Sequence, residues 1–207
     1  MMRWRGAMLD ISRHFFDAQF IKKTISSLAI FNYNTLHLHL TDDQGWRLES
    51  KVFPLLHQVG SIRKHSQNNH GLLEPTFDGV EHSGFLTHED VREIIVHASS
   101  LGMQVIPEIN IPGHTGALLA AYPQFGINQN PVEVSGRWGI SDHLLRPFPE
   151  TYEFLKNVFR EVAELFPSDY IHVGGDESWG DCVAGDRASG EFAGDGFGES
   201  DEAGFAG

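Results

Sequence analysis

The 207-residue sequence predicts an α/β fold of the (β/α)8-barrel type, with only about the first four βα units present. Strand-like runs alternate with helix-like segments, an order typical of parallel strands with helices packed outside them. No Gly-x-Gly-x-x-Gly pattern follows the first strand-like run, which disfavours a doubly wound dinucleotide-binding sheet. Polar residues gather just after each predicted strand, where a barrel assembles its active site.

The predicted strands are short apolar runs, of the length expected for strands buried in a parallel sheet. They cover residues 7–11, 35–40, 104–109 and 170–173. A complete barrel needs eight such strands and about 250 residues. We therefore expect residues 1–182 to form the N-terminal half of a barrel.

Three segments between these runs repeat apolar residues at helical spacing. Asp17 and Thr87 stand where an N-cap is expected, and Thr87 opens a Thr-His-Glu-Asp sequence that is typical of a helix start. Pro149 fits the first turn of the third segment, and Pro167 ends it. The expected helices cover residues 17–31, 87–102 and 149–165.

Two long loops and a tail are expected outside these elements. Residues 60–85 are rich in His, Asn, Ser and Gly, and residues 123–148 form a second loop region. Long loops that follow barrel strands usually shape the substrate pocket. Residues 183–207 change abruptly to Gly, Ala, Asp and Glu, a low-complexity acidic composition that predicts disorder.

Composition excludes several classes of partner and site. A formal net charge of −13 argues against nucleic acid or an anionic membrane as the main partner. The single cysteine, Cys182, excludes an intrachain disulfide framework and a cysteine-built zinc site. No apolar run approaches the roughly 20 residues needed to cross a bilayer, so we expect no membrane insertion. Residues 1–5 lack the apolar core of a signal peptide.

An acidic pair follows the fourth predicted strand. Gly174 and Gly175 end the strand, and Asp176 and Glu177 come next. Neighbouring residues on a regular strand point to opposite faces, so both acids can face one ligand only if the chain turns at the glycines. Two close carboxylates repel each other as anions, which raises the pKa of one and favours a proton donor near neutral pH. The alternative is a solvated acidic turn.

Further polar residues follow the other predicted strands. His114 comes after the third strand, and Asp42 and Asp43 come after the second. A histidine can pair with a carboxylate and set its protonation state, although turns often carry such residues as caps or surface groups. Arg13, after the first strand, either binds ligand hydroxyls or forms a structural ion pair. Trp46 either stacks on a ligand or packs in the core.

His37 and His39 suggest an alternative chemistry. The His-Leu-His sequence puts both imidazoles on one face of the second strand, a spacing that metal-dependent barrel hydrolases of the amidohydrolase type use. With Asp42 and His114 near, a zinc site is conceivable. Against it, those hydrolases place the pair on the opening strand, and the other strands offer only His172 as a further histidine.

Four segments, in order on successive βα units, resemble the motifs of glycoside hydrolase family 20, the β-N-acetylhexosaminidases. The segments are Leu9-Asp-Ile-Ser-Arg-His-Phe15, Tyr33-Asn-Thr-Leu-His-Leu-His-Leu-Thr-Asp-Asp-Gln-Gly-Trp-Arg47, Pro107-Glu-Ile-Asn-Ile-Pro-Gly-His114 and His172-Val-Gly-Gly-Asp-Glu177. The resemblance covers roughly residues 4–182. It implies removal of terminal N-acetylhexosamine from glycans, with such a glycan as the partner and with no metal or organic cofactor.

The resemblance also implies a role for each site residue. Glu177 matches the general acid, and Asp176 matches the residue that orients the 2-acetamido group of the substrate and stabilises the charge developing on it. Asp42 and His114 match a pair that supports Glu177, and Arg13 matches the arginine that holds hydroxyls of the terminal sugar. The substrate's own acetamido oxygen is the nucleophile, so this family is an exception to the two-carboxylate scheme, and configuration is retained.

The sequence also departs from the family. Members carry further sugar-contacting Trp, Tyr and Glu residues on the later half of the barrel, and usually an N-terminal domain and a secretion signal. We expect the chain to derive from a fragment, or from a reading frame that shifts near Cys182, and to be poorly active alone. A non-catalytic carbohydrate-binding remnant is the third alternative, since half a barrel leaves sheet edges unpaired. For full-length members the resemblance suggests a secreted, periplasmic or lysosomal location.

Overall fold

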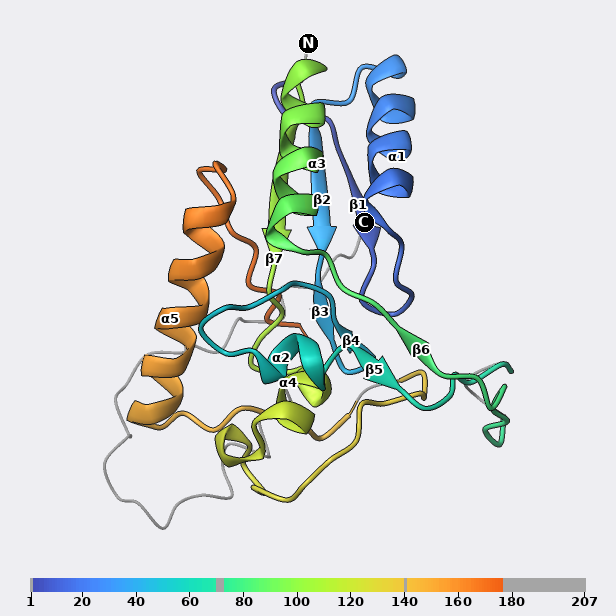
Figure 1. Ribbon diagram of the computed structural model, residues 1–207, viewed down its shortest axis with the longest axis vertical. Coiled ribbons are helices and arrows are strands. Elements are labelled where there is room, and N and C mark those ends of the chain that lie inside the picture. The colour runs from blue at the N-terminus through green and yellow to red at the C-terminus, as the bar shows by residue number, and fades with distance from the viewer. Residues whose placement is uncertain (1, 70–72, 140, 177–207) are drawn as a thin grey trace, which may run out of the picture.

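A sheet of three parallel strands organises the computed structural model, which describes residues 2–69, 73–139 and 141–176 (Figure 1). The strands are β1 (Gly6–Asp10), β2 (Thr35–His39) and β7 (Gln104–Glu108), and β2 lies in the centre. Each strand is reached from the previous one through a helix. The predicted alternation of strands and helices is therefore confirmed, and the sheet does not close into a barrel within the described residues.

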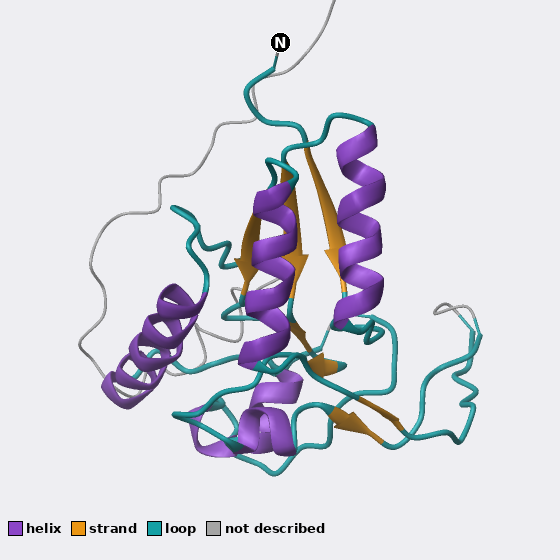
Figure 2. Cartoon of the chain, turned by 45° about the horizontal axis from the view of Figure 1, so that its top comes forward, coloured by secondary structure: helices purple, strands orange, loops and turns teal. Residues whose placement is uncertain are grey.

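Two helices cover one face of this sheet. Figure 2 shows α1 (Ala18–Ile30) and α3 (His88–Ser100) side by side over the strands, and the two helices are in contact. Leu36 and Leu38 of β2 share a face, and both are completely buried. They belong to one apolar core with residues of the helices: Ile21, Ile25, Val91 and Ile94. The opposite face of the sheet stays partly exposed, as Met8 of β1 shows.

The three predicted helices are confirmed to within two residues at each end. α1 begins after Asp17, whose side chain accepts a hydrogen bond from the backbone N–H of Phe20. α3 begins with a capping box in which Thr87 and Asp90 each accept a hydrogen bond from the other's backbone N–H. α5 (Pro149–Leu165) has Pro149 in its first turn, where no N–H is needed.

The fourth predicted strand is reduced to a single parallel bridge between Glu108 and His172. Backbone hydrogen bonds keep the segment beside β7: His172 N–H donates to Pro107 O (2.9 Å), and His172 O accepts from Ile109 N–H (3.1 Å). The strand is short because it pairs on one side only within the described part of the chain. In addition, Gly174 and Gly175, which follow Val173, have positive φ and end the extended conformation.

Short elements that the sequence pattern did not indicate lie between the predicted strands and helices. None is longer than six residues, too short for a helical or strand period to be recognised. They are β3 (Thr41–Asp42), β4 (Gly45–Trp46), α2 (Leu55–Gln58), β5 (Ile62–Arg63), β6 (His82–Ser83), α4 (Gly116–Ala121) and the 3₁₀ turn η1 (Pro123–Phe125). Most of residues 60–85 and 123–148 is irregular, as expected.

A buried arginine joins the loops below the strand ends. The guanidinium of Arg47 donates to the carbonyl oxygens of Ser12 (3.0 and 3.1 Å), Ser61 (2.7 Å), Gly84 (3.0 Å) and Gln44 (3.1 Å). Burial lowers the pKa of Arg47 to about 9. Four loop segments therefore share one cation as their common hydrogen-bond donor.

Trp46 lies in the core and is 2% exposed, and its indole N–H donates to Leu48 O at 2.8 Å. Its core role is therefore confirmed, and stacking on a ligand is the wrong alternative.

Two expectations concern other properties of the chain. Cys182, the boundary at residue 182 and the tail of residues 183–207 lie outside the described residues, so those predictions stay untested. Among the helices that the structure describes, none is both long and apolar enough to cross a membrane.

Shortening one buried side chain of the central strand, β2, should test the core. Leu38→Ala removes a completely buried side chain, so we expect the free energy of unfolding to fall by about 2–5 kcal/mol through lost burial and a cavity. Urea denaturation measures the change. Val96→Ala is the control, because Val96 of α3 is 70% exposed and should change stability by no more than about 0.5 kcal/mol. Equal effects of the two changes would contradict this description of the core.

Candidate active site

The register of the sheet puts three polar residues in one row at the carboxyl ends of the strands. Asp10 of β1 lies opposite His39 of β2, and His39 lies opposite Glu108 of β7. His39 and Glu108 are 4% and 3% exposed, whereas 27% of the Asp10 side chain is exposed, so the row is buried at β2 and β7. Polar groups that are buried in this way need partners, and the loops after the strands provide them.

Asp42 is the centre of these partners. Its Oδ2 lies 2.8 Å from a guanidinium nitrogen of Arg13 and 3.0 Å from Nε2 of His39, and its Oδ1 lies 3.1 Å from Nδ1 of His114. Oδ1 also accepts the backbone N–H of Asp43 at 2.7 Å. Burial alone would raise the pKa of Asp42, but the hydrogen bonds from both histidines and the charge of Arg13 lower it below its ordinary value. Asp42 is therefore a buried carboxylate.

His114 connects Asp42 with the acidic turn. Besides Asp42, its Nδ1 lies 3.4 Å from Oδ2 of Asp43, and its Nε2 lies 3.7 Å from Oδ2 of Asp176. The hydrogen bonds to Asp42 and Asp43 raise the pKa of His114 to about 10, although burial opposes them. His114 also has a positive φ of 53°, which is uncommon outside glycine. The imidazole is therefore a cation among three carboxylates.

Asp176 lies at the open side of the site, and its side chain is 63% exposed. The side-chain amide of Asn110 donates to Oδ1 of Asp176 (3.2 Å), and the Asn110 oxygen accepts the backbone N–H of Gly175 (3.4 Å). Positive φ values at Gly174 (69°) and Gly175 (95°) confirm the unusual dihedrals expected of these glycines. A Cβ at residue 174 would collide with the Asn110 amide, so a larger residue there would displace Asn110.

Asn110 was not singled out from the sequence. Asn110 follows Glu108 by two residues. Side chains at this spacing lie on one face of an extended chain, so the position of Asn110 just after the third strand could have indicated that it faces the site.

Arg13 forms the ion pairs that were one of its two interpretations, and binding of ligand hydroxyls stays a prediction. Its guanidinium makes ion pairs with Asp10 (3.0 Å) and Asp42 (2.8 Å), and 41% of its side chain stays exposed. The structure thus brings together Arg13, Asp42, His114 and Asp176, four of the five predicted site residues. Glu177, the fifth, lies outside the described residues.

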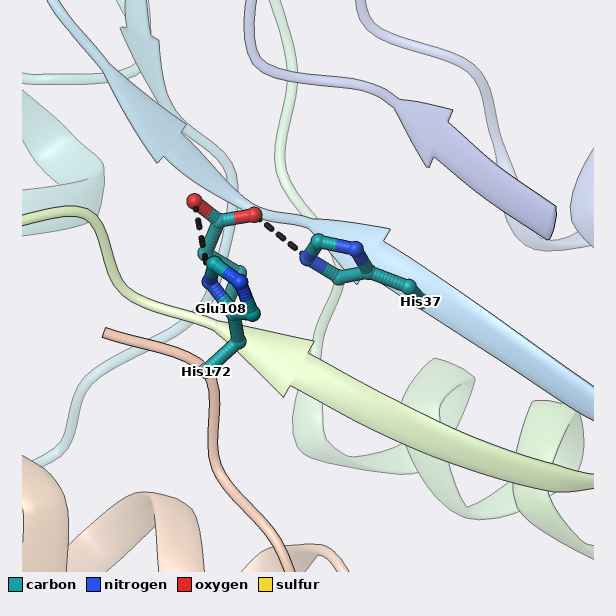
Figure 3. Close-up of side chains that lie close together, drawn as sticks. All are labelled: His37, Glu108 and His172. Carbon is teal, nitrogen blue, oxygen red and sulfur yellow. Dashed lines mark hydrogen bonds and ion pairs between the residues drawn. The ribbon is translucent and has the colours of Figure 1, made fainter. Parts of the chain in front are cut away.

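The histidines of β2 do not form the metal pair of the alternative interpretation, because His39 has a carboxylate at each ring nitrogen. Its Nδ1 lies 2.9 Å from Oε2 of Glu108, and its Nε2 lies 3.0 Å from Oδ2 of Asp42. His37 instead joins Glu108 and His172 in a group whose ligand atoms lie within 4.8 Å of one another (Figure 3). Hydrogen bonds already use that group: Nε2 of His37 lies 2.5 Å from Glu108, and Nδ1 of His172 accepts the Gly174 N–H at 3.0 Å. The amidohydrolase-like alternative is not favoured.

An alanine at residue 174 should destabilise the chain more than an alanine at residue 79. Both glycines have a φ of 69°, but a Cβ at Gly79 would meet no atom within 4 Å. Gly79→Ala should therefore show only the cost of a left-handed alanine, about 1–2 kcal/mol. Gly174→Ala adds the collision with Asn110, and urea denaturation should show a larger loss. Equal losses would mean that the turn can move away from Asn110.

Stability should depend on pH through the buried histidines. The pKa values of His39 and His114 rise from 6.5 to about 9 and about 10, so their stabilisation is complete below pH 6.5 and is lost as the pH rises through 9–10. The pKa of Asp42 is lowered, so its stabilisation is lost in acid. Urea denaturation should show a plateau at about pH 5–6.5 and a decline from there toward pH 10. Asp42→Asn, which removes the shared carboxylate, should flatten the alkaline decline; an unchanged slope would contradict the assignment.

Comparisons with known proteins agree with the motifs. Residues 2–194 match the sequence model of the glycosyl hydrolase family 20 catalytic domain. A beta-hexosaminidase of Akkermansia muciniphila is 40% identical over 185 residues, which are 86% of this chain and 36% of that protein. A beta-hexosaminidase of Vibrio furnissii is 42% identical over 179 residues, 84% of this chain and 29% of that protein. The chain thus spans about a third of the length of these relatives.

Solved structures that resemble this chain are β-N-acetylhexosaminidases as well. A crystal structure of a beta-N-acetylhexosaminidase matches with a TM-score of 0.81 and 38% identity, over 90% of this chain and 39% of that one. The family 20 β-N-acetylhexosaminidase of Streptomyces coelicolor A3(2) matches with a TM-score of 0.75 and 36% identity, over 85% of this chain and 33% of that one. These neighbours confirm the predicted fold class, the first part of a (β/α)8 barrel. The chain belongs to glycosyl hydrolase family 20, and it corresponds to part of the catalytic domain.

Proposed function

We propose that this chain carries the acid–base side of an active site that hydrolyses terminal, non-reducing N-acetyl-β-hexosaminides. The observation that carries the proposal is the constellation of Arg13, Asp42, His114 and Asp176 at successive strand ends of a family 20 domain. Relatives named beta-hexosaminidase support the substrate class, a glycan that contains N-acetylhexosamine. In the full barrel, residues of the later strands would complete the sugar site.

The first step of the proposed reaction is attack by the substrate itself. The acetamido oxygen attacks the anomeric carbon, and the cyclic, positively charged intermediate that forms is then opened by water, so two inversions retain the configuration. A well-oriented internal nucleophile can lower the barrier by about 7–11 kcal/mol through its effective concentration. The enzyme then needs to orient the acetamide rather than to supply a nucleophile.

Asp176 is the residue that we assign to this orientation. Its carboxylate is exposed, and one of its oxygens is fixed by Asn110. A carboxylate in this position can accept the acetamide N–H and stabilise the positive charge as it develops. Because Asn110 also holds Gly175, the acid and its backbone are positioned by one side chain.

Glu177 is the residue that we assign to proton transfer. By its place in the family motif it protonates the departing glycosidic oxygen and then accepts a proton from the attacking water. Asp42 and His114 support it: Asp42 keeps His114 charged, and a cation at that point sets the electrostatic environment of the acidic turn. Arg13, held between Asp10 and Asp42 but still exposed, is suited to bind hydroxyls of the terminal sugar.

Substitution of the two acids tests the proposal. With a chromogenic N-acetyl-β-glucosaminide, Glu177→Gln should lower kcat by about 10²–10⁴-fold because no acid remains to protonate the leaving group. Asp176→Asn should also lower kcat, with a smaller change in KM, since its charge acts mainly on the intermediate. Glu164→Gln, an exposed change on α5, is the control and should leave both constants unchanged.

Three results would contradict the assignment. Unchanged turnover after Glu177→Gln would exclude it as the acid. Turnover that stops with a chelator and returns with zinc would favour the metal-dependent alternative. Binding of N-acetylglucosamine by the unmodified chain without any release of the chromophore would instead make the chain a carbohydrate-binding remnant.

A further inference from the structure

Glu108 contacts three histidines: His37 and His172, which Figure 3 shows, and His39. We propose that Glu108 and His39 are positioning residues, which lock the Asp42 carboxylate of the proposed active site in one orientation. The inference rests on the proposed function and deepens it, because it explains what holds the partner of His114 in place.

The contacts of Glu108 are unequal. Its Oε2 lies 2.5 Å from Nε2 of His37 and 2.9 Å from Nδ1 of His39, whereas its Oε1 lies 3.4 Å from Nδ1 of His172. The His172 side chain is 51% exposed, but that of His39 is 5% exposed. The contact with His39 is therefore the one that is both short and shielded from water, where a charge-assisted hydrogen bond is strongest.

His39 lies between Glu108 and Asp42 and connects them. Its two ring nitrogens face two different carboxylates, Glu108 and Asp42. A neutral imidazole has one N–H and could donate to only one of them, so the geometry fits the imidazolium, which donates to both. Asp10 adds a third negative charge nearby. A guanidinium nitrogen of Arg13 lies 3.3 Å from Nε2 of His39; because it can only donate, it is a hydrogen-bond partner for a neutral Nε2 and an unfavourable positive charge beside an imidazolium.

The pKa of His39 agrees with this geometry. Burial alone would lower it, but the hydrogen bonds to Asp42 and Glu108 raise it to about 9. His39 is then a cation throughout the neutral range, fixed from behind by the Glu108 carboxylate.

The consequence for Asp42 is a fixed assignment of its two oxygens. His39 and Arg13 together hold Oδ2, which leaves Oδ1 to face His114. Without Glu108, the His39 ring can turn or lose its second proton, and Asp42 keeps only the partly exposed Arg13 at Oδ2. Glu108, His39, Asp42 and His114 therefore form one row of alternating charge that ends at the acidic turn.

The decisive variant is Glu108→Gln, which keeps the shape of the side chain and removes its charge. Glu161→Gln is the matched control: the Glu161 carboxylate is also largely buried (10% exposed) and also lies near a histidine, His88, at 3.5 Å, but it belongs to α5 and does not contact the Asp42 group. Both variants are made in the whole chain, and circular dichroism reports whether each one folds.

The first readout is independent of turnover. Nitrogen-15 NMR of the histidine rings, with the His39 signals assigned by their loss in His39→Gln, should show both nitrogens of His39 protonated at pH 7.5. In Glu108→Gln the pKa of His39 should fall by about one unit or more because a charged partner is lost. In Glu161→Gln it should not move. A neutral His39 in the unmodified chain, or an unchanged pKa in Glu108→Gln, would overturn the proposal.

The second readout is catalytic. Glu108→Gln should lower kcat about tenfold to a hundredfold, the contribution expected of a hydrogen bond to a charged group, while KM stays within about twofold. The alkaline limb of the kcat profile should move to lower pH, and Glu108→Asp, which keeps the charge, should move it back. If Glu108→Gln and Glu161→Gln lowered kcat equally, the role of Glu108 would be structural only.

The two proposals can fail separately. Unchanged turnover after Glu177→Gln contradicts the proposed function, but the NMR titration still decides the role of Glu108. If Glu108→Gln does not fold, the protonation state of His39 in the unmodified chain decides it.

Discussion

The parallel register of β1, β2 and β7 is the constraint on which the site depends. It aligns Asp10, His39 and Glu108 across three strands, so that groups far apart in the sequence reach hydrogen-bonding distance. A shift of one residue in either pairing would turn a polar side chain toward the helices and an apolar one toward the site. The buried leucines of β2, which face the opposite side, resist such a shift. The packing of the core thus determines the position of the chemistry.

The charges of the site hold one another in the charged form. Burial of an isolated carboxylate or imidazolium is unfavourable, and it is tolerated only where an opposite charge and hydrogen bonds replace water. Asp42 illustrates this balance, because two histidines and an arginine bring its pKa below the ordinary value in spite of burial. The group therefore behaves as a unit, in which the state of one member changes the state of its neighbours.

The sequence indicated the main elements and most of the site, for identifiable physical reasons. The long amphipathic helices and the buried strands have clear periods, and the rule that polar residues at strand ends converge placed Arg13, Asp42 and His114 together. Glu108 and Asn110 escaped notice, because the partners that give them a role come from other strands and are far away in the sequence. The short helices α2 and α4 escaped because one or two turns carry no recognisable period. The fourth strand was expected in full, but the glycines that shape the acidic turn end it early.

The buried guanidinium of Arg47 has a consequence for how the protein responds to acid. Its partners are backbone carbonyls, which neither gain nor lose protons, whereas the site residues are held together by carboxylates that do. Protonation of Asp42 or Glu108 would break the ion pairs around them, but the loops would stay hydrogen-bonded to Arg47. Acid therefore affects the site and its scaffold differently. The loops that Arg47 joins can keep their conformation at a pH at which the carboxylates of the proposed active site have lost their charge.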